Sequence, residues 1–194
     1  MSFISNENKQ KVMDTALTLF QEKGVEEVSV REICEAAGVP RSSFYTIFSG
    51  KEDILAAQVE NVKMDFESMM PAFLQASSDF ERIWFLTDAY IKLAVQFGPN
   101  MTKAALKMEL EGRLNFLGFI ESFNDWLITL IGNCQKNGII GNPSDPADLL
   151  RIQLDLSKGV LLDWARNDGS YDIEDRIRQS FYRLLLVPEE YQLS

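Results

Sequence analysis

The sequence has no histidine and only two cysteines, Cys34 and Cys134, among its 194 residues. Without histidine, a Ser-His-Asp triad, a Cys-His dyad and a histidine-ligated zinc site are all impossible. Two cysteines are too few for an all-thiolate zinc site. Each cysteine lies within a helical apolar pattern, so we expect two buried thiols rather than a disulfide. Since no carboxylate pair or nucleophile constellation is present either, we expect no metal, no cofactor and no enzymatic activity.

Long apolar runs and positive charge are also scarce. No run approaches the roughly 18–20 residues of a membrane span, and the first residues, MSFISNENKQKVMD, lack a signal-peptide pattern, so we expect a cytoplasmic protein without a membrane partner. The net charge is −10, which argues against nonspecific coating of nucleic acid. Residues 1–51, however, carry six basic and seven acidic side chains. This nearly neutral segment permits a local surface that faces phosphate.

The apolar spacing is helical nearly throughout, without alternating strand patterns or hairpin turns. It predicts an all-α fold of about nine helices. The first helix is expected at residues 8–23. A pair of helices follows, which begins at Ser29 and turns at Gly38. The next helix spans residues 51–70 and ends or bends at Pro71. Further helices are expected at 78–97, 101–112, 114–137, 145–167 and 173–186.

The segment from Ser29 to Leu55 has the form of a helix-turn-helix, whose second helix enters the major groove of DNA. On that helix, an arginine and small or hydroxyl-bearing side chains can reach base edges or phosphates. The groove-facing candidates are Arg41, Ser42, Ser43, Tyr45 and Thr46. Ser29 and Lys51 lie at helix N-termini, where backbone N–H groups favour phosphate. A helix pair with a glycine turn also occurs in other all-α proteins, where such a polar surface is simply solvated.

Residues 8–55 resemble the N-terminal domain of the TetR family of bacterial transcriptional regulators. The matching segments are, in order, ALTLFQEKGVEEVSVREICEAAGV, SSFYTIF and KEDIL. The sequence departs from the family pattern at Cys34, where alanine is usual, at Pro40, where serine or threonine is frequent, and at Ile47, where histidine is frequent. The resemblance implies a DNA-binding helix-turn-helix domain over residues 1–55 and a helical ligand-binding and dimerisation domain over residues 56–194. It assigns the groove-facing and phosphate-contacting roles to the same seven residues.

The resemblance also implies a homodimer bound to double-stranded operator DNA. The apolar spacing of the last two helices fits a four-helix interface across a two-fold axis. The candidate interface residues are Leu149, Ile152, Leu156, Val160, Trp164, Ile177, Phe181 and Leu184. The same spacing is compatible with packing inside one chain. A dimer is favoured because two recognition helices about 34–36 Å apart can read successive turns of the duplex.

Aromatic and methionine side chains are concentrated between residues 64 and 126. Such residues form packed core more often than pockets, but a pocket between bundle helices is lined by the same types. The candidate pocket residues are Phe66, Met70, Phe73, Trp84, Phe85, Met108, Phe119, Phe123 and Trp126. The expected occupant is a small apolar or aromatic molecule, with a lipophilic cation as an alternative. We therefore expect a homodimeric repressor that a ligand releases from its operator; the alternative is a DNA-bound interaction protein without a small-molecule inducer.

Overall fold

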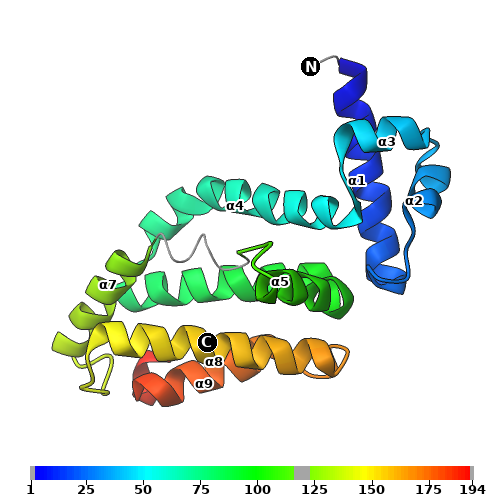
Figure 1. Ribbon diagram of the computed structural model, residues 1–194. Coiled ribbons are helices and arrows are strands. Elements are labelled where there is room, and N and C mark those ends of the chain that lie inside the picture. Colours follow the sequence, from blue (N-terminus) through cyan, green and yellow to red (C-terminus); the bar gives the residue numbers. More distant parts are fainter. Residues whose placement is uncertain (1–2, 116–122, 193–194) are drawn as a thin grey trace. The chain divides into compact units, whose positions relative to one another are not determined.

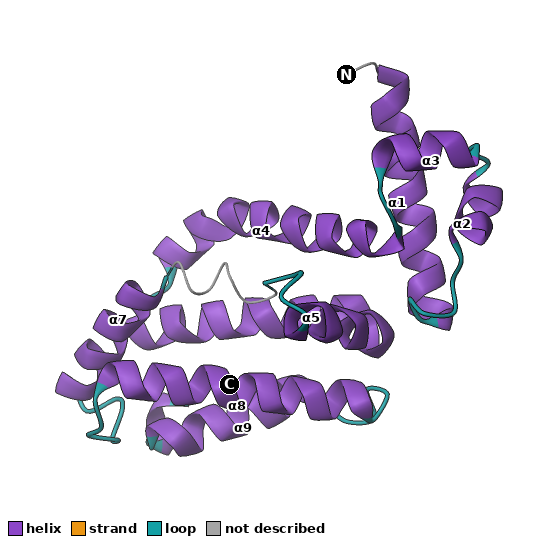
Figure 2. Ribbon diagram, in the orientation of Figure 1, coloured by secondary structure: helices purple, strands orange, loops and turns teal. Residues whose placement is uncertain are grey.

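The computed structural model describes residues 3–115 and 123–192, and within these ranges the backbone is helical, without a strand (Figure 1 and Figure 2). The expected all-α fold is therefore confirmed. The helices in these ranges are α1 Phe3–Lys23, α2 Val30–Ala37, α3 Arg41–Ile47, α4 Lys51–Gln75, α5 Asp79–Leu110, α7 Asn124–Lys136, α8 Pro146–Arg166, α9 Ile173–Leu185 and the short 3-10 helix η1 Glu189–Tyr191. None of these helices combines the length and the apolarity that a bilayer crossing requires.

The helices pack as two compact units. Unit 1 comprises Met1–Met64 and Phe97–Phe116, and unit 2 comprises Asp65–Gln96 and Leu117–Ser194. Helices α4 and α5 each contribute to both units. The functional boundary expected at residue 55 stays a prediction, since these units describe packing and not activity.

Unit 1 is held together by apolar side chains of α1, α2 and α3 and of the C-terminal part of α5. Its buried residues include Val12, Met13, Ala16, Phe20, Ile33, Ala37, Phe44, Met101 and Ala105. Two polar contacts attach α5 to the end of α1 and to the loop after it. The side-chain amide of Asn100 donates to the Gln21 carbonyl at 3.3 Å, and Lys107 forms an ion pair with Glu26. The last turns of α5 therefore belong to the same unit as the helix-turn-helix.

Unit 2 is a helical bundle whose core lies among α5, α7, α8 and α9. Its buried residues include Phe80, Ile83, Leu86, Tyr90, Leu127, Ile131, Leu149, Leu161, Trp164, Ile177 and Phe181. The turn between α8 and α9 is fixed by Tyr171, whose carbonyl accepts a hydrogen bond from the Trp164 indole at 3.1 Å. The Tyr171 hydroxyl donates to the Val160 carbonyl at 3.0 Å, and Arg176 lies over its ring at 4.6 Å from the centroid. These contacts set the angle at which α9 returns along α8.

Two expected helix boundaries were wrong, and one expected break was found. Helix α4 continues through Pro71 to Gln75, although proline removes a backbone donor and normally ends or kinks a helix. Burial of Phe73 just beyond the proline stabilises the last turn. The helix expected at 114–137 begins at Asn124, and Leu114 lies outside any helix; residues 116–122 lie outside the described residues. The break expected between residues 97 and 101 is present as a kink inside α5, where Gly98 has the non-helical angles φ 71° and ψ 170°.

The two cysteines are free and buried, as the sequence indicates. Cys34 lies in unit 1 and Cys134 in unit 2. Burial raises the pKa of the Cys134 thiol to about 12 and also raises the pKa of Cys34. Both thiols are therefore protonated near neutral pH and behave as small apolar side chains.

Candidate nucleic-acid interface and ligand site

The first helix of the helix-turn-helix begins at a side-chain cap. Ser29 has extended backbone angles, φ −94° and ψ 151°, and its hydroxyl oxygen accepts from the Glu32 backbone N–H at 3.1 Å. The Glu32 carboxylate pairs with Lys23 at the end of α1. The Ser29 hydroxyl proton can still be donated to a phosphate, so its predicted role is compatible with its capping role.

The turn between α2 and α3 depends on Gly38. This residue has φ 62° and ψ 36°, a left-handed conformation that glycine adopts without strain. The N–H of Val39 donates back to the Cys34 carbonyl at 3.0 Å, which closes the end of α2. Pro40 then precedes α3 as its N-cap. The turn therefore fixes the direction of α3 relative to α2.

Helix α3 is divided into a buried side and an exposed side. Phe44 is fully buried and Phe48 is nearly so, and their ring centroids lie 5.8 Å apart. The exposed residues are Arg41, Ser42, Tyr45 and Thr46. These four recur at i, i+1, i+4 and i+5, so they form one stripe along the helix. The fifth groove-facing candidate, Ser43, is half-buried at the edge of this stripe.

The polar atoms of the stripe differ in what they can offer to DNA. Arg41 has no ion-pair partner among the described side chains, so its guanidinium is available to a base edge or phosphate. The Thr46 hydroxyl donates to the Ser42 carbonyl at 2.9 Å, so it can act as an acceptor while its methyl group remains apolar. Tyr45 is 52% exposed. An open hollow at the turn is lined by both Arg41 and Arg31.

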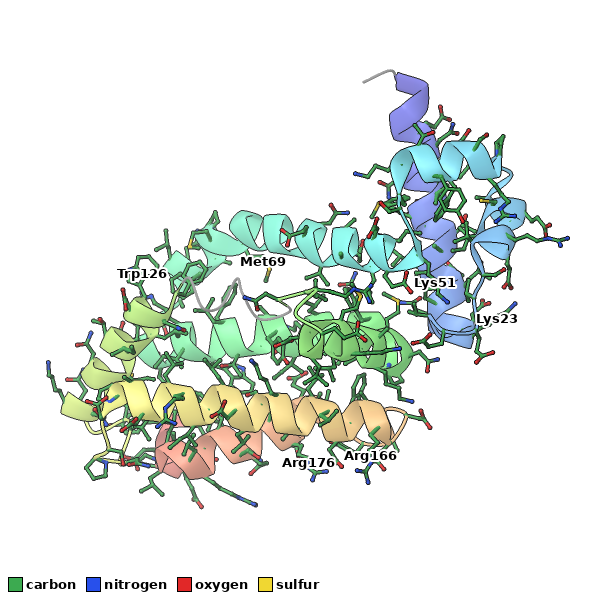
Figure 3. The ribbon with its side chains drawn as sticks, in the orientation of Figure 1. Lys23, Lys51, Met69, Trp126, Arg166 and Arg176 are labelled. Atoms are coloured by element: carbon green, nitrogen blue, oxygen red, sulfur yellow. The ribbon has the colours of Figure 1, made fainter. Side chains whose placement is uncertain are left out.

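Lys51 occupies the first position of α4, but its side chain is already engaged. Its ammonium donates to the backbone carbonyls of Glu26 at 2.9 Å and of Val28 at 3.0 Å (Figure 3). This interaction ties the start of α4 to the loop between α1 and α2. Phosphate contact by Lys51 stays a prediction, and the backbone N–H groups at the start of α4 are the donors best placed for it.

Sequence reasoning missed Arg31. It lies one position after the start of α2, is exposed, and pairs with Glu35 at 2.7 Å. The same hollow that Arg41 lines also includes Arg31. A phosphate would compete with Glu35 for this guanidinium, because an exposed i,i+4 pair is weak. The spacing of Arg31 and Glu35 marks an ordinary helix pair, so only the fold reveals its proximity to Arg41.

In unit 2, four of the nine predicted pocket residues form one aromatic cluster. Phe73 contacts Phe85 and Trp126, with ring centroids at 6.0 Å and 5.7 Å, and Phe123 contacts Trp126 at 6.2 Å. Beside this cluster lies a surface hollow of about 240 Å³. Trp126 of α7, which is labelled in Figure 3, lines it. We call it the aromatic hollow; it is lined by Phe73, Leu74, Arg82, Trp126, Thr129 and Leu130.

Among the described residues, three other predicted pocket residues lie apart from this cluster. Trp84 packs on Phe181 of α9 with centroids 5.5 Å apart. Met108 is buried in unit 1, and Met70 is half-buried on α4. The Phe66 side chain and the whole of Phe119 lie outside the described part of the structure.

Unit 2 also contains a small enclosed cavity that none of the predicted pocket residues lines. Its volume is about 30 Å³, and its walls come from α5, α7, α8 and α9. Gln153 lines it, is 5% exposed, and uses its amide N–H to bond Ser157 at 3.2 Å. The Gln153 side-chain oxygen has no hydrogen-bond partner among the described residues. A cavity of this size is too small for an organic ligand.

The predicted dimer residues fall into two groups. Leu149, Trp164, Ile177 and Phe181 are buried inside unit 2, with exposures of 0–6%. Their side chains pack against their own chain, so these four cannot form the surface of an interface. The other four predicted residues reach solvent to some degree: Ile152, Leu156, Val160 and Leu184. Ile152 is the most accessible of them at 42% exposure.

The described residues combine a helix-turn-helix that has an exposed polar stripe with a helical bundle. This combination is typical of helical DNA-binding regulators. Residues 12–57 match the family model described as "Bacterial regulatory proteins, tetR family". The negative regulator IcaR of the biofilm operon icaADBC, from Staphylococcus epidermidis, is 28% identical over 116 residues, which cover 53% of this chain and 61% of that protein. The chain thus matches about three-fifths of this relative's length.

Two solved structures share the fold over nearly the full length. The transcriptional regulator FadR from Bacillus subtilis, in complex with stearoyl-CoA, has a TM-score of 0.66 and 20% identity, covering 91% of this chain and 97% of its own. AibR, in complex with isovaleryl coenzyme A and operator DNA, has a TM-score of 0.62 and 18% identity, covering 93% of this chain and 100% of its own. Residues 12–57 therefore form a DNA-binding domain of the tetR family of bacterial regulatory proteins, and the two solved structures show that the chain shares their fold. These relatives are regulators and not enzymes, in agreement with the sequence-based expectation.

Proposed function

We propose that the protein is a homodimeric repressor that binds double-stranded operator DNA through α3 and leaves it when a small apolar or aromatic molecule binds unit 2. The observation that carries the DNA-binding role is the exposed stripe of Arg41, Ser42, Tyr45 and Thr46 above the buried Phe44. A solvated helix of seven residues needs no exposed tyrosine, whereas a groove-facing helix gains contact area from one. The operator complex of AibR supports this role by likeness of fold.

The direct test is fluorescence anisotropy with DNA from upstream of the protein's own coding sequence and a scrambled duplex of equal length. We expect saturable binding to the native fragment and at least tenfold weaker binding to the scrambled one, in line with the usual gap between specific and nonspecific affinity. Equal and weak binding to both would contradict the proposal for this DNA. It would favour the alternative of an interaction protein whose C-terminal unit engages another protein.

Replacing Arg41 by alanine should weaken operator binding by about tenfold or more, because a base-edge or phosphate contact of arginine is lost. If the contact is to phosphate, the slope of log affinity against log salt should also become shallower by about 0.9. The matched control is Arg166→Ala, which removes an exposed arginine at the end of α8 in unit 2. Anisotropy titrations at several salt concentrations measure both quantities. Unchanged affinity in Arg41→Ala would remove this residue from the interface.

Dimerisation is proposed to use the accessible apolar side chains of α8 and α9. Replacing Ile152 by glutamate should convert the dimer to a folded monomer, because a carboxylate at the centre of an apolar interface is desolvated without a partner. The control is Val95→Glu, since Val95 is an exposed apolar residue of α5 in the same unit. Sedimentation velocity gives the mass of each variant. A dimeric Ile152→Glu protein would show that the interface lies elsewhere.

Ligand binding in unit 2 can influence the DNA-binding helices only if the ligand has different affinities for two arrangements of the chain. Helix α4 begins at Lys51 in unit 1 and ends beside Phe73 in the aromatic hollow, so it provides a covalent path between the two sites. The hollow, at about 240 Å³, exceeds the roughly 150 Å³ that accommodates benzene. This size supports the role of a small aromatic inducer.

A further inference from the structure

One wall of the aromatic hollow is a stacked pair of rings. Phe73 and Trp126 lie 5.7 Å apart with an interplanar angle of 11°. Phe73 is almost completely buried, whereas Trp126 is 51% exposed. The pair thus presents a fixed indole to solvent, and Leu74 beside it is also exposed. A flat apolar ligand would cover surface that otherwise contacts water.

Besides its apolar side chains, the hollow has one charged residue among its described lining residues, Arg82. One terminal nitrogen of its guanidinium donates to the Asp79 carboxylate at 2.8 Å, and the other donates to the Ala76 carbonyl at 2.8 Å. Asp79 is held in turn by the side-chain amide of Asn133 at 3.0 Å. Because a guanidinium has five N–H donors, three remain without a partner among the described residues. The side chain is 27% exposed, so a ligand can reach it.

The chemistry of these walls selects one class of ligand. A cation is repelled by Arg82, which argues against the lipophilic cation considered from the sequence. A neutral ring gains only the stacking and apolar contacts, whereas a carboxylate also gains charge-assisted hydrogen bonds from a guanidinium that is already oriented. Asp79 offsets part of the positive charge, so recognition depends on the direction of the N–H donors. The volume of about 240 Å³ limits the ligand to one or two rings.

We propose that the aromatic hollow binds an aromatic carboxylate, with its ring against Trp126 and its carboxylate on Arg82. This inference rests on the proposed function only for the consequence that binding releases operator DNA. Thr129 adds a hydroxyl at the rim, whose proton is donated to the Asp125 carbonyl at 2.9 Å, so its oxygen can accept from a ring hydroxyl. Hydroxylated aromatic acids should therefore bind at least as well as benzoate.

The test measures binding of benzoate to the full-length protein by isothermal titration calorimetry, without DNA. Benzyl alcohol, benzylamine and cyclohexanecarboxylate are the comparison ligands, because each lacks one recognised feature or reverses its charge. We expect benzoate to bind at least tenfold more tightly than the other three. Equal affinity for benzoate and benzyl alcohol, or no binding of benzoate at millimolar concentration, would overturn the proposal.

Variants identify the anchoring groups. Arg82→Gln should weaken benzoate binding about tenfold, the loss expected for one charge-assisted contact, while leaving benzyl alcohol affinity unchanged. Arg166→Gln is the matched arginine control. Arg82 also bonds residues at the start of α5, so its replacement affects the local structure as well as the ligand contact. Trp126→Leu therefore serves as a second variant, at an exposed position, and it should weaken the binding of both benzoate and benzyl alcohol. Benzoate binding that survives both substitutions would place the ligand elsewhere.

Operator release is measured separately by adding benzoate to the protein–DNA complex in the anisotropy assay. Benzoate that binds the free protein but leaves the complex intact would support the site and contradict the proposed release. Release by a neutral aromatic molecule, with no binding of benzoate, would support the regulator and overturn the aromatic-carboxylate proposal.

Discussion

Replacement of Phe181 by glutamate should unfold unit 2 instead of separating two folded subunits. Phe181 is 1% exposed, and its ring lies 5.7 Å from Phe80 and 5.5 Å from Trp84. Removing a buried phenylalanine side chain alone costs about 3–5 kcal/mol, and a buried unpaired carboxylate adds to this. Typical domains are stable by only about 5–15 kcal/mol. Urea denaturation followed by circular dichroism should therefore show a much lower midpoint or no folded baseline.

The control for this experiment is Ile152→Glu, which introduces the same side chain on the accessible face of α8. Its urea midpoint should stay close to that of a single subunit of the unmodified protein, because Ile152 is 42% exposed within the subunit. A Phe181→Glu protein that remained folded and became monomeric would contradict the structure. It would place Phe181 on the subunit surface, where the sequence pattern alone had put it.

Phe181 and Ile152 illustrate why apolar spacing predicts which face of a helix is apolar but not what that face packs against. Ile177 and Phe181 follow the i, i+4 rule on α9, and Ile152 and Leu156 follow it on α8. The spacing identifies both pairs as apolar faces. It cannot show which face meets the chain's own core, because that depends on where α5 runs. Phe80 and Trp84 of α5 contact Phe181, and Ile177 is fully buried, whereas no described side chain covers Ile152 to that extent.

The helix-turn-helix could be predicted closely because its determinants are local. The cap at Ser29, the left-handed Gly38 and the buried Phe44 all act within one or two turns of each other. The aromatic hollow was predicted only in part. Its aromatic walls are visible as a composition bias, but Arg82 forms an ordinary helical pair with Asp79 in the sequence. Its position beside Trp126 of α7 results from helix packing, which no local pattern encodes.

Phe44 and Tyr45 are adjacent aromatic residues of α3 whose replacement by alanine should have different effects. Phe44 is fully buried, and Tyr45 is 52% exposed, with the two ring centroids 5.4 Å apart at 81°. Phe44→Ala should destabilise unit 1 by about 3–5 kcal/mol, because it leaves a cavity beneath the recognition helix. Tyr45→Ala should change stability by no more than about 1.5 kcal/mol, the value of one edge-to-face contact. Thermal unfolding measures both differences.

Operator binding should decrease in both variants but for separable reasons. In Phe44→Ala the folded helix-turn-helix is less populated, so an excluded osmolyte such as trimethylamine N-oxide, which favours compact states, should restore binding. In Tyr45→Ala the helix is folded but lacks a groove contact, so the osmolyte should not restore binding. Restoration in both would assign Tyr45 a structural role only, and full affinity in Tyr45→Ala would remove it from the interface. Because the two positions are neighbours on one helix, this comparison separates holding the recognition helix in place from reading the DNA with it.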